Sequence, residues 1–89
     1  MRLNKEFQLC SIAGRDFLIP VGTAVVDVQR MLDLNEVGAY IIKLLKNHEC
    51  TVDELTEYIF QEYEAEKDMI QKDLQAFISK GIEIGFLQE

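Results

Sequence analysis

Apolar residues change their spacing along this chain near Asn35. Before that position they alternate with polar residues over short runs, as in half-buried β-strands, and after it they recur every three or four residues, as in helices. The pattern predicts an α+β fold, in which a small N-terminal antiparallel sheet of three or four short strands precedes three α-helices. Because 89 residues suffice for one modest core, we expect a single domain, 1–89.

Short strands and tight turns account for the first third of the chain. The expected strands span residues 6–13, 16–20, 24–28 and 31–34, and the expected turns span 14–15, 21–23 and 29–30. Phe7 and Leu9 share one face of the first strand, and the shift of the apolar pattern after Cys10 indicates a bulge. Pro20 has no backbone N–H, so it should end the pairing of the second strand or lie on an edge.

Capping residues mark where the helices begin. The Asn35 side chain is suited to accept a hydrogen bond from the first turn, and Glu36 places a negative charge at the positive end of that helix. Thr51 and Glu54 have the spacing of a capping box, and a third helix should begin near Glu66. The expected inner stripes are Val37, Tyr40, Ile41, Leu44 and Leu45; Val52, Leu55, Ile59 and Tyr63; and Ile70, Leu74, Phe77 and Ile78.

Two glycines compete to end the third helix. Gly81 is a possible C-cap, but the apolar stripe continues through it to Ile84, which favours Gly85 as the cap. Gly81 would then be an interior glycine, about 1 kcal/mol less favourable than alanine in a helix, at a place where a small residue lets another segment approach closely. Phe86 and Leu87 would fold back as the apolar contact beyond the cap.

The charge of the chain is strongly uneven. Residues 1–47 carry six basic and five acidic side chains, a balance of +1, whereas residues 48–89 carry three and eleven, a balance of −8. Such an acidic surface repels nucleic-acid phosphates and attracts basic partners. No apolar run approaches the ~18 residues of a membrane span, and Met1–Glu6 lacks the apolar region of a secretion signal, so we expect a cytoplasmic protein.

Candidate chemistry is sparse. Cys10 and Cys50 are the only cysteines, and we expect two unpaired thiols, one on a strand and one in an exposed link between helices. His48 is the only histidine, and no pattern places it beside a nucleophile or in a set of metal ligands. Asp73, with apolar neighbours, is the best candidate for a catalytic acid. We expect no enzyme activity, no cofactor and no metal.

Several segments together resemble the PqqD-like family, also called the RiPP recognition element. The resemblance covers about Glu6 to Leu87 and is moderately specific at the junction of the sheet and the first helix. The matching segments are Leu18-Ile19-Pro20, Leu34-Asn35-Glu36-Val37-Gly38-Ala39-Tyr40-Ile41, Thr51-Val52-Asp53-Glu54-Leu55, Asp73-Leu74, Phe77-Ile78 and Gly85-Phe86-Leu87.

The resemblance implies a winged-helix-like domain that binds peptides without catalysing a reaction. The partner would be the leader segment of a precursor peptide, which adds as a strand to the last strand of the sheet and packs against the third helix. A modifying enzyme, commonly a radical SAM maturase, then receives the leader; whether the product is PQQ or another peptide stays open. The implied peptide-binding residues are Arg30, Met31, Leu32 and Asp33 at the edge, and Asp73, Leu74, Phe77 and Lys80 on the helix.

Two other functions are compatible with this order of elements. A winged-helix DNA-binding regulator would have the same strands and helices, but the acidic C-terminal half argues against it. A structural subunit could use the free edge of the sheet to pair with a second copy of itself, so that either a monomer or a homodimer is expected.

Overall fold

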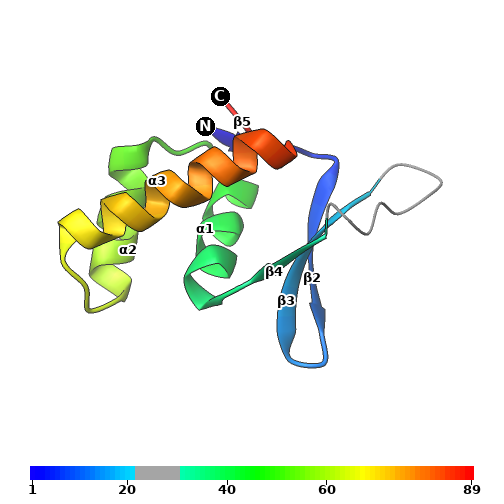
Figure 1. The fold of residues 1–89 in the computed structure, drawn as a ribbon, viewed down its shortest axis with the longest axis horizontal. Coiled ribbons are helices and arrows are strands. Elements are labelled where there is room, and N and C mark those ends of the chain that lie inside the picture. The colour runs from blue at the N-terminus through cyan, green and yellow to red at the C-terminus, as the bar shows by residue number, and fades with distance from the viewer. Residues whose placement is uncertain (22–30) are drawn as a thin grey trace.

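The computed structural model describes residues 1–21 and 31–89. The strand expected at 24–28, the turn at 29–30 and most of the turn at 21–23 lie outside these residues. The strands are β1 (Arg2–Leu3), β2 (Phe7–Ile12), β3 (Arg15–Pro20), β4 (Leu32–Leu34) and β5 (Leu87–Gln88), and the helices are α1 (Glu36–Asn47), α2 (Val52–Glu62) and α3 (Lys67–Ile84), as Figure 1 shows. The predicted α+β order of a small sheet followed by three helices is confirmed.

The main sheet is antiparallel, with β3 between β2 and β4. The β2–β3 register runs without a break from Phe7 opposite Pro20 to Ile12 opposite Arg15, so the expected bulge was wrong. The apolar pattern shifts because Ile12 lies near the tip of the hairpin, where half of it is exposed. The turn itself is Ala13-Gly14, one residue earlier than expected, and both residues have positive φ, which suits the twist of a two-residue hairpin.

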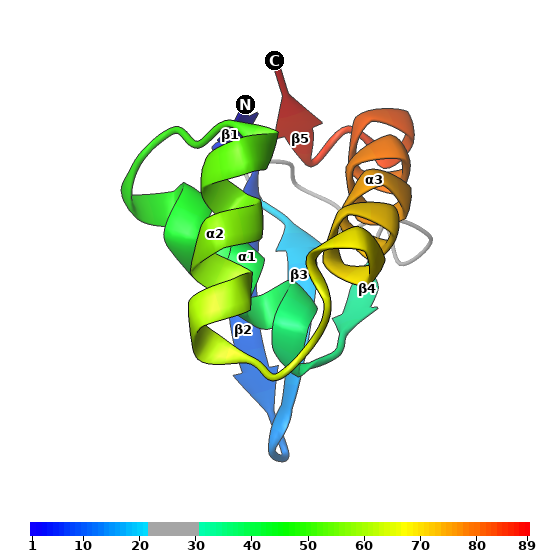
Figure 2. The same ribbon diagram turned by 90° about the vertical axis from the view of Figure 1, so that its left-hand side faces the viewer.

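The two ends of the chain form a second, smaller ladder that the sequence pattern did not predict. β1 and β5 pair antiparallel, with Arg2 opposite Gln88 and Leu3 opposite Leu87. Figures 1 and 2 show both termini at the same end of the molecule. This pairing holds the segment after α3 against the rest of the fold.

The predicted helix boundaries are confirmed. Asn35 Oδ1 accepts a hydrogen bond of 2.7 Å from the Gly38 N–H, and both hydrogen bonds of the Thr51–Glu54 capping box are present at 3.1 Å. α3 ends at Ile84 and is capped by Gly85, whose φ of 103° is left-handed and therefore suits glycine. The preferred ending at Gly85 was correct.

Helix α1 is central, because it contacts all three strands of the main sheet and its apolar residues belong to the same core as those of α2 and α3. The stripe expected for it was therefore too narrow. Ala39 and Ile42 are buried as well as Ile41 and Leu45, whereas Val37, Tyr40 and Leu44 are only partly buried. A helix covered on two sides does not keep the single apolar face from which a stripe is inferred.

Cys50 is buried, with 1% of its surface exposed, so its expected place in an exposed link was wrong. The backbone of Met1 pairs with Cys50, which brings the N-terminal strand over the link between α1 and α2. Both cysteines are free, as expected. Within the described part of the chain, no helix combines the length and the apolar character that crossing a membrane requires.

Candidate functional site

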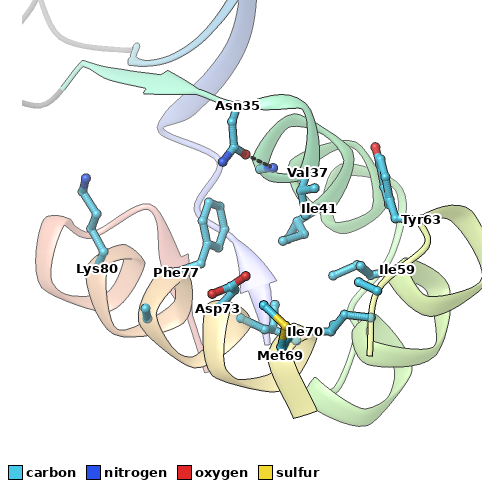
Figure 3. A pocket seen from close by; sticks show the side chains of 14 residues that line it. Asn35, Val37, Ile41, Ile59, Tyr63, Met69, Ile70, Asp73, Phe77 and Lys80 are labelled. Carbon is cyan, nitrogen blue, oxygen red and sulfur yellow. Dashed lines mark hydrogen bonds between the residues drawn. The ribbon is translucent and has the colours of Figure 1, made fainter. Parts of the chain in front are cut away.

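A hollow of about 530 Å³ lies where the first two turns of α1, the end of α2 and residues 69–80 of α3 meet. Its lining is mostly apolar, and two charged side chains from α3 border it. Figure 3 shows the labelled residues around this space, with β4 and α3 on opposite sides of it. The apolar lining includes Val37, Ile41, Ile59, Tyr63, Met69, Ile70, Leu74 and Phe77, and the charged residues are Asp73 and Lys80.

The start of α1 shapes one wall of the hollow. Asn35 fixes the first turn by capping Gly38, and Gly38 has no side chain to fill the space beside it. A Cβ at Gly38 would lie 3.2 Å from Asn35 Oδ1, which is tight, and in ordinary van der Waals contact with Phe77 Cε2 at 3.4 Å and Leu34 Cδ2 at 3.5 Å, so α3 and the end of β4 pack directly beside this turn. Phe77 in turn packs edge-to-face on Phe86 with ring centroids 5.5 Å apart.

A strand edge lies next to this hollow. β4 pairs with β3 on one side, and its other edge has no strand partner within residues 1–21 and 31–89. Unpaired backbone N–H and C=O groups at such an edge are available to an added strand. The site therefore combines two features that suit an extended peptide, namely backbone groups along β4 and an apolar floor along α3.

All four helix residues implied by the family resemblance line the hollow: Asp73, Leu74, Phe77 and Lys80. Leu74 is fully packed in the core, Phe77 is half-buried, and the two charged residues are exposed.

The three described residues of the expected strand edge, unlike the helix residues, do not line the hollow. Met31 and Leu32 are half-buried and do not line the hollow, and Arg30 lies outside the described residues. Asp33 is exposed and forms an ion pair with Arg15 of the neighbouring strand. Its carboxylate therefore already has a cationic partner, whereas its backbone remains part of the β4 edge.

Two tyrosines stand at the α2 end of the site. The rings of Tyr40 and Tyr63 pack edge-to-face with centroids 5.7 Å apart. Desolvation raises the pKa of Tyr63, and the carboxylates of Glu36 and Glu62 raise it further. Tyr63 therefore stays neutral at physiological pH and can donate a hydrogen bond from the rim of the hollow.

The geometry offers little for catalysis. Asp73 is exposed, so it does not lie in the apolar enclosure expected of a catalytic acid. Burial raises the pKa of the Cys50 thiol, and the Glu54 carboxylate adds to this, so the unreactive thiol form is favoured. Among the residues that the structure describes, no group of three or more histidine, cysteine, aspartate or glutamate side chains is placed to hold a metal ion.

Sequence reasoning missed the wall contributed by α1 and α2. Val37, Ile41, Ile59 and Tyr63 were expected only as core stripes, and Asn35 only as a helix cap. Their proximity to α3 depends on how the three helices pack. One local signal existed: Gly38 is a glycine in the first turn of α1, where the absence of a side chain leaves room beside a neighbouring segment.

The model of the family described as coenzyme PQQ synthesis protein D (PqqD) matches residues 22–87 of the chain. A solved structure of TbiB1 in complex with the TbiA(beta) leader peptide has a similar fold, with a TM-score of 0.77 and 20% sequence identity over 99% of this chain and 95% of that chain. At this identity the likeness establishes the fold alone. No match was found among curated proteins.

Proposed function

Because this chain belongs to the PqqD family, we propose that it binds the leader segment of a ribosomally made precursor peptide and performs no chemistry itself. The observation that carries the proposal is the combination of a β4 edge, which no strand of residues 1–21 and 31–89 covers, with an apolar hollow beside α3. TbiB1, which has a similar fold, was solved with a leader peptide bound, and this supports the same class of ligand here.

The backbone of the leader adds to β4 as a fourth strand of the main sheet. Hydrogen bonds between the two backbones supply affinity that depends little on sequence, and side-chain pockets supply specificity. β4 is only Leu32–Leu34, so the backbone contact alone is short. Side chains of the leader must therefore contribute much of the binding, and the hollow beside α3 is placed to receive them.

The bound leader is then presented to a modifying enzyme, for which a radical SAM maturase is the expected class. In this scheme the domain raises the local concentration of the precursor near the enzyme, and the reaction takes place on the partner. The acidic helical half of the chain suits a basic patch on that partner, since opposite charges speed encounter.

Titration of a leader peptide into isotope-labelled protein tests this function. The probe is the N-terminal half of the short precursor peptide that we expect to be encoded beside this gene. We expect saturable backbone amide shifts at Met31–Leu34 and along Asp73–Lys80, together with slowed hydrogen exchange of β4 amides that point away from β3. Shifts without added protection would argue against strand addition, and no shifts at high peptide excess would contradict leader binding.

The β4 edge, which has no strand partner in the described part of the chain, also favours a second candidate, pairing with another copy of the chain. Light scattering at several concentrations distinguishes a monomer from a dimer. If a dimer forms through β4, the leader peptide should dissociate it, because both need the same backbone groups.

A further inference from the structure

We propose that the leader segment carries one acidic and one basic side chain four positions apart, with an apolar side chain midway between them. Lys80 pairs with the acidic side chain, Asp73 pairs with the basic one, and the ring of Phe77 supports the apolar one. This inference rests on the proposed leader-binding function and adds the chemistry of the bound segment.

The two charges of the site are available to a ligand. Asp73 and Lys80 are both exposed, and neither forms an ion pair or a side-chain hydrogen bond with any residue of the ranges 1–21 and 31–89. Asp33, the other acidic residue near the edge, is already paired with Arg15. A basic residue of the leader would therefore find its partner at Asp73 rather than at Asp33.

The order of side chains along α3 sets the order of contacts. Asp73 and Lys80 are separated by seven positions, about two helical turns, so they lie on the same face of α3 about 10 Å apart along its axis. Phe77 lies between them on that face. Figure 3 shows Lys80 and Asp73 on either side of the Phe77 ring, which points towards Gly38 and the first turn of α1.

An extended peptide matches this spacing only in certain registers. A strand advances about 3.3 Å per residue, and only every second side chain points to the same face of the sheet. Side chains at positions i and i+4 therefore share a face and stand about 13 Å apart, with i+2 midway. The flexible stem of Lys80 covers the remaining difference. A spacing of three would point the two charged side chains to opposite faces.

Selection from a displayed library of random peptides tests the charge pattern without knowledge of the precursor. The immobilised full chain should enrich peptides with opposite charges at i and i+4 and an apolar residue at i+2. In a double variant, Asp73→Lys with Lys80→Glu, the order of the two charges in the enriched peptides should reverse.

A matched control exchanges charges away from the hollow. Lys72 and Glu83 are exposed on α3 and do not line it, so Lys72→Glu with Glu83→Lys keeps the net charge and should enrich the same peptides as the original chain. Calorimetry then compares an enriched peptide with its charge-swapped counterpart. We expect a preference of about fivefold for the enriched order, inverted in the Asp73/Lys80 variant, which is the range of exposed ion pairs.

The outcomes separate this inference from the function on which it rests. Peptides that shift the amides of Met31–Leu34 but show no charge pattern, or the same pattern on all three proteins, would overturn the inference and leave leader binding intact. If neither the enriched peptides nor the natural leader shift these amides, both proposals are contradicted. Thermal melts of the three proteins establish that each is folded.

Discussion

The two ends of helix α3 differ in how far other segments of the described chain cover them. Near its C-terminal end, the chain folds back and covers the helix with Phe86 and Leu87, which are 0% and 4% exposed. Along residues 69–80, no segment of the described chain fills the space, Met69 is 60% exposed, and a hollow of about 530 Å³ remains. Both parts of the helix present apolar side chains, so the difference lies in what covers them.

This difference indicates which surface of the domain is available for binding. At the covered end, α3 and the returning segment are in close contact, since a Cβ at Gly81 would lie 2.5 Å from Leu87 Cδ1. The β1–β5 ladder holds this covering segment in place. The open end lies beside the edge of β4 that no described strand pairs with, and it leaves apolar surface that the described residues do not bury. Exposed apolar surface bordered by charges is typical of an interaction site.

Replacing the main covering side chain should have the largest effect. Phe86 is fully buried and packs edge-to-face on Phe7 and Phe77 at 6.1 and 5.5 Å. Phe86→Ala should lower the free energy of unfolding by about 3–5 kcal/mol, as measured by urea denaturation. The control is Met69→Ala at the open end, which should change stability by no more than about 0.5 kcal/mol. Equal losses at the two ends would contradict the comparison.

Adding one methyl group at the covered end should also destabilise the fold. Gly81→Ala places a Cβ 2.5 Å from Leu87 Cδ1 and 3.0 Å from Phe86 Cε1. Overpacking costs typically about 1–3 kcal/mol, and alanine regains up to about 1 kcal/mol of helix propensity, so we expect a net loss of about 1–2 kcal/mol. The same measurement on Ser79→Ala, an exposed position in α3, should show no loss. An increase in stability for Gly81→Ala would mean that Leu87 moves aside freely.

At the open end, truncation should affect binding rather than stability. Met69→Ala removes an exposed apolar side chain from the lining of the hollow. If the leader buries it, affinity should fall by up to about tenfold, since a buried methionine contributes roughly 1.5 kcal/mol. Calorimetry with the leader peptide measures this. Ile82→Ala is the matched control, because Ile82 is also exposed on α3 but does not line the hollow.

Removing either of two helix caps should cost the same stability, but only one removal should weaken leader binding. Asn35 caps α1 at the hollow, and Thr51 caps α2 away from it. Asn35→Ala and Thr51→Ala should each lower the free energy of unfolding by about 1 kcal/mol. Only Asn35→Ala should also weaken leader binding, because it loosens the turn that carries Gly38 and faces Phe77. A similar loss of affinity in both variants would show that general destabilisation, not the site, controls binding.

How much of this was predictable from sequence differs between the two ends of α3. At the covered end, the continuous stripe through Gly81 and the glycine at 85 predicted the long helix and the returning Phe86-Leu87, because these are local effects of spacing and capping. The pairing of β5 with β1 was not predictable, since a two-residue strand carries no periodic pattern.

At the open end, the prediction came from the family resemblance and covered only α3 and β4. Ile41 from α1 and Ile59 from α2 also line the hollow, and their proximity depends on helix packing rather than on any local pattern. The ion pair between Arg15 and Asp33 was missed for the same reason, because it joins positions 18 residues apart across two strands.

The smallest expected effect is a pH dependence at the capping box. The hydrogen bond from the Thr51 backbone N–H to Glu54 Oε1, at 3.1 Å, holds the pKa of Glu54 below its ordinary value of 4.5, and the Thr51 hydroxyl and the charge of His48 act in the same direction. A carboxyl whose pKa is lower in the folded state binds fewer protons there than in the unfolded chain. Its stabilising contribution is therefore complete above the unfolded pKa and is lost as the pH falls through the folded one.

Glu54→Gln should consequently be less stable than the original chain above about pH 5, and the difference should shrink as the pH falls below 4.5. Urea denaturation across this range measures it, with Glu64→Gln as the control, since Glu64 is exposed and has no ion pair or hydrogen bond within the described residues. Because the capping box lies away from the hollow, leader affinity at pH 7 should be the same for both variants. A pH-independent difference for Glu54→Gln would mean that its carboxylate charge contributes nothing to the cap.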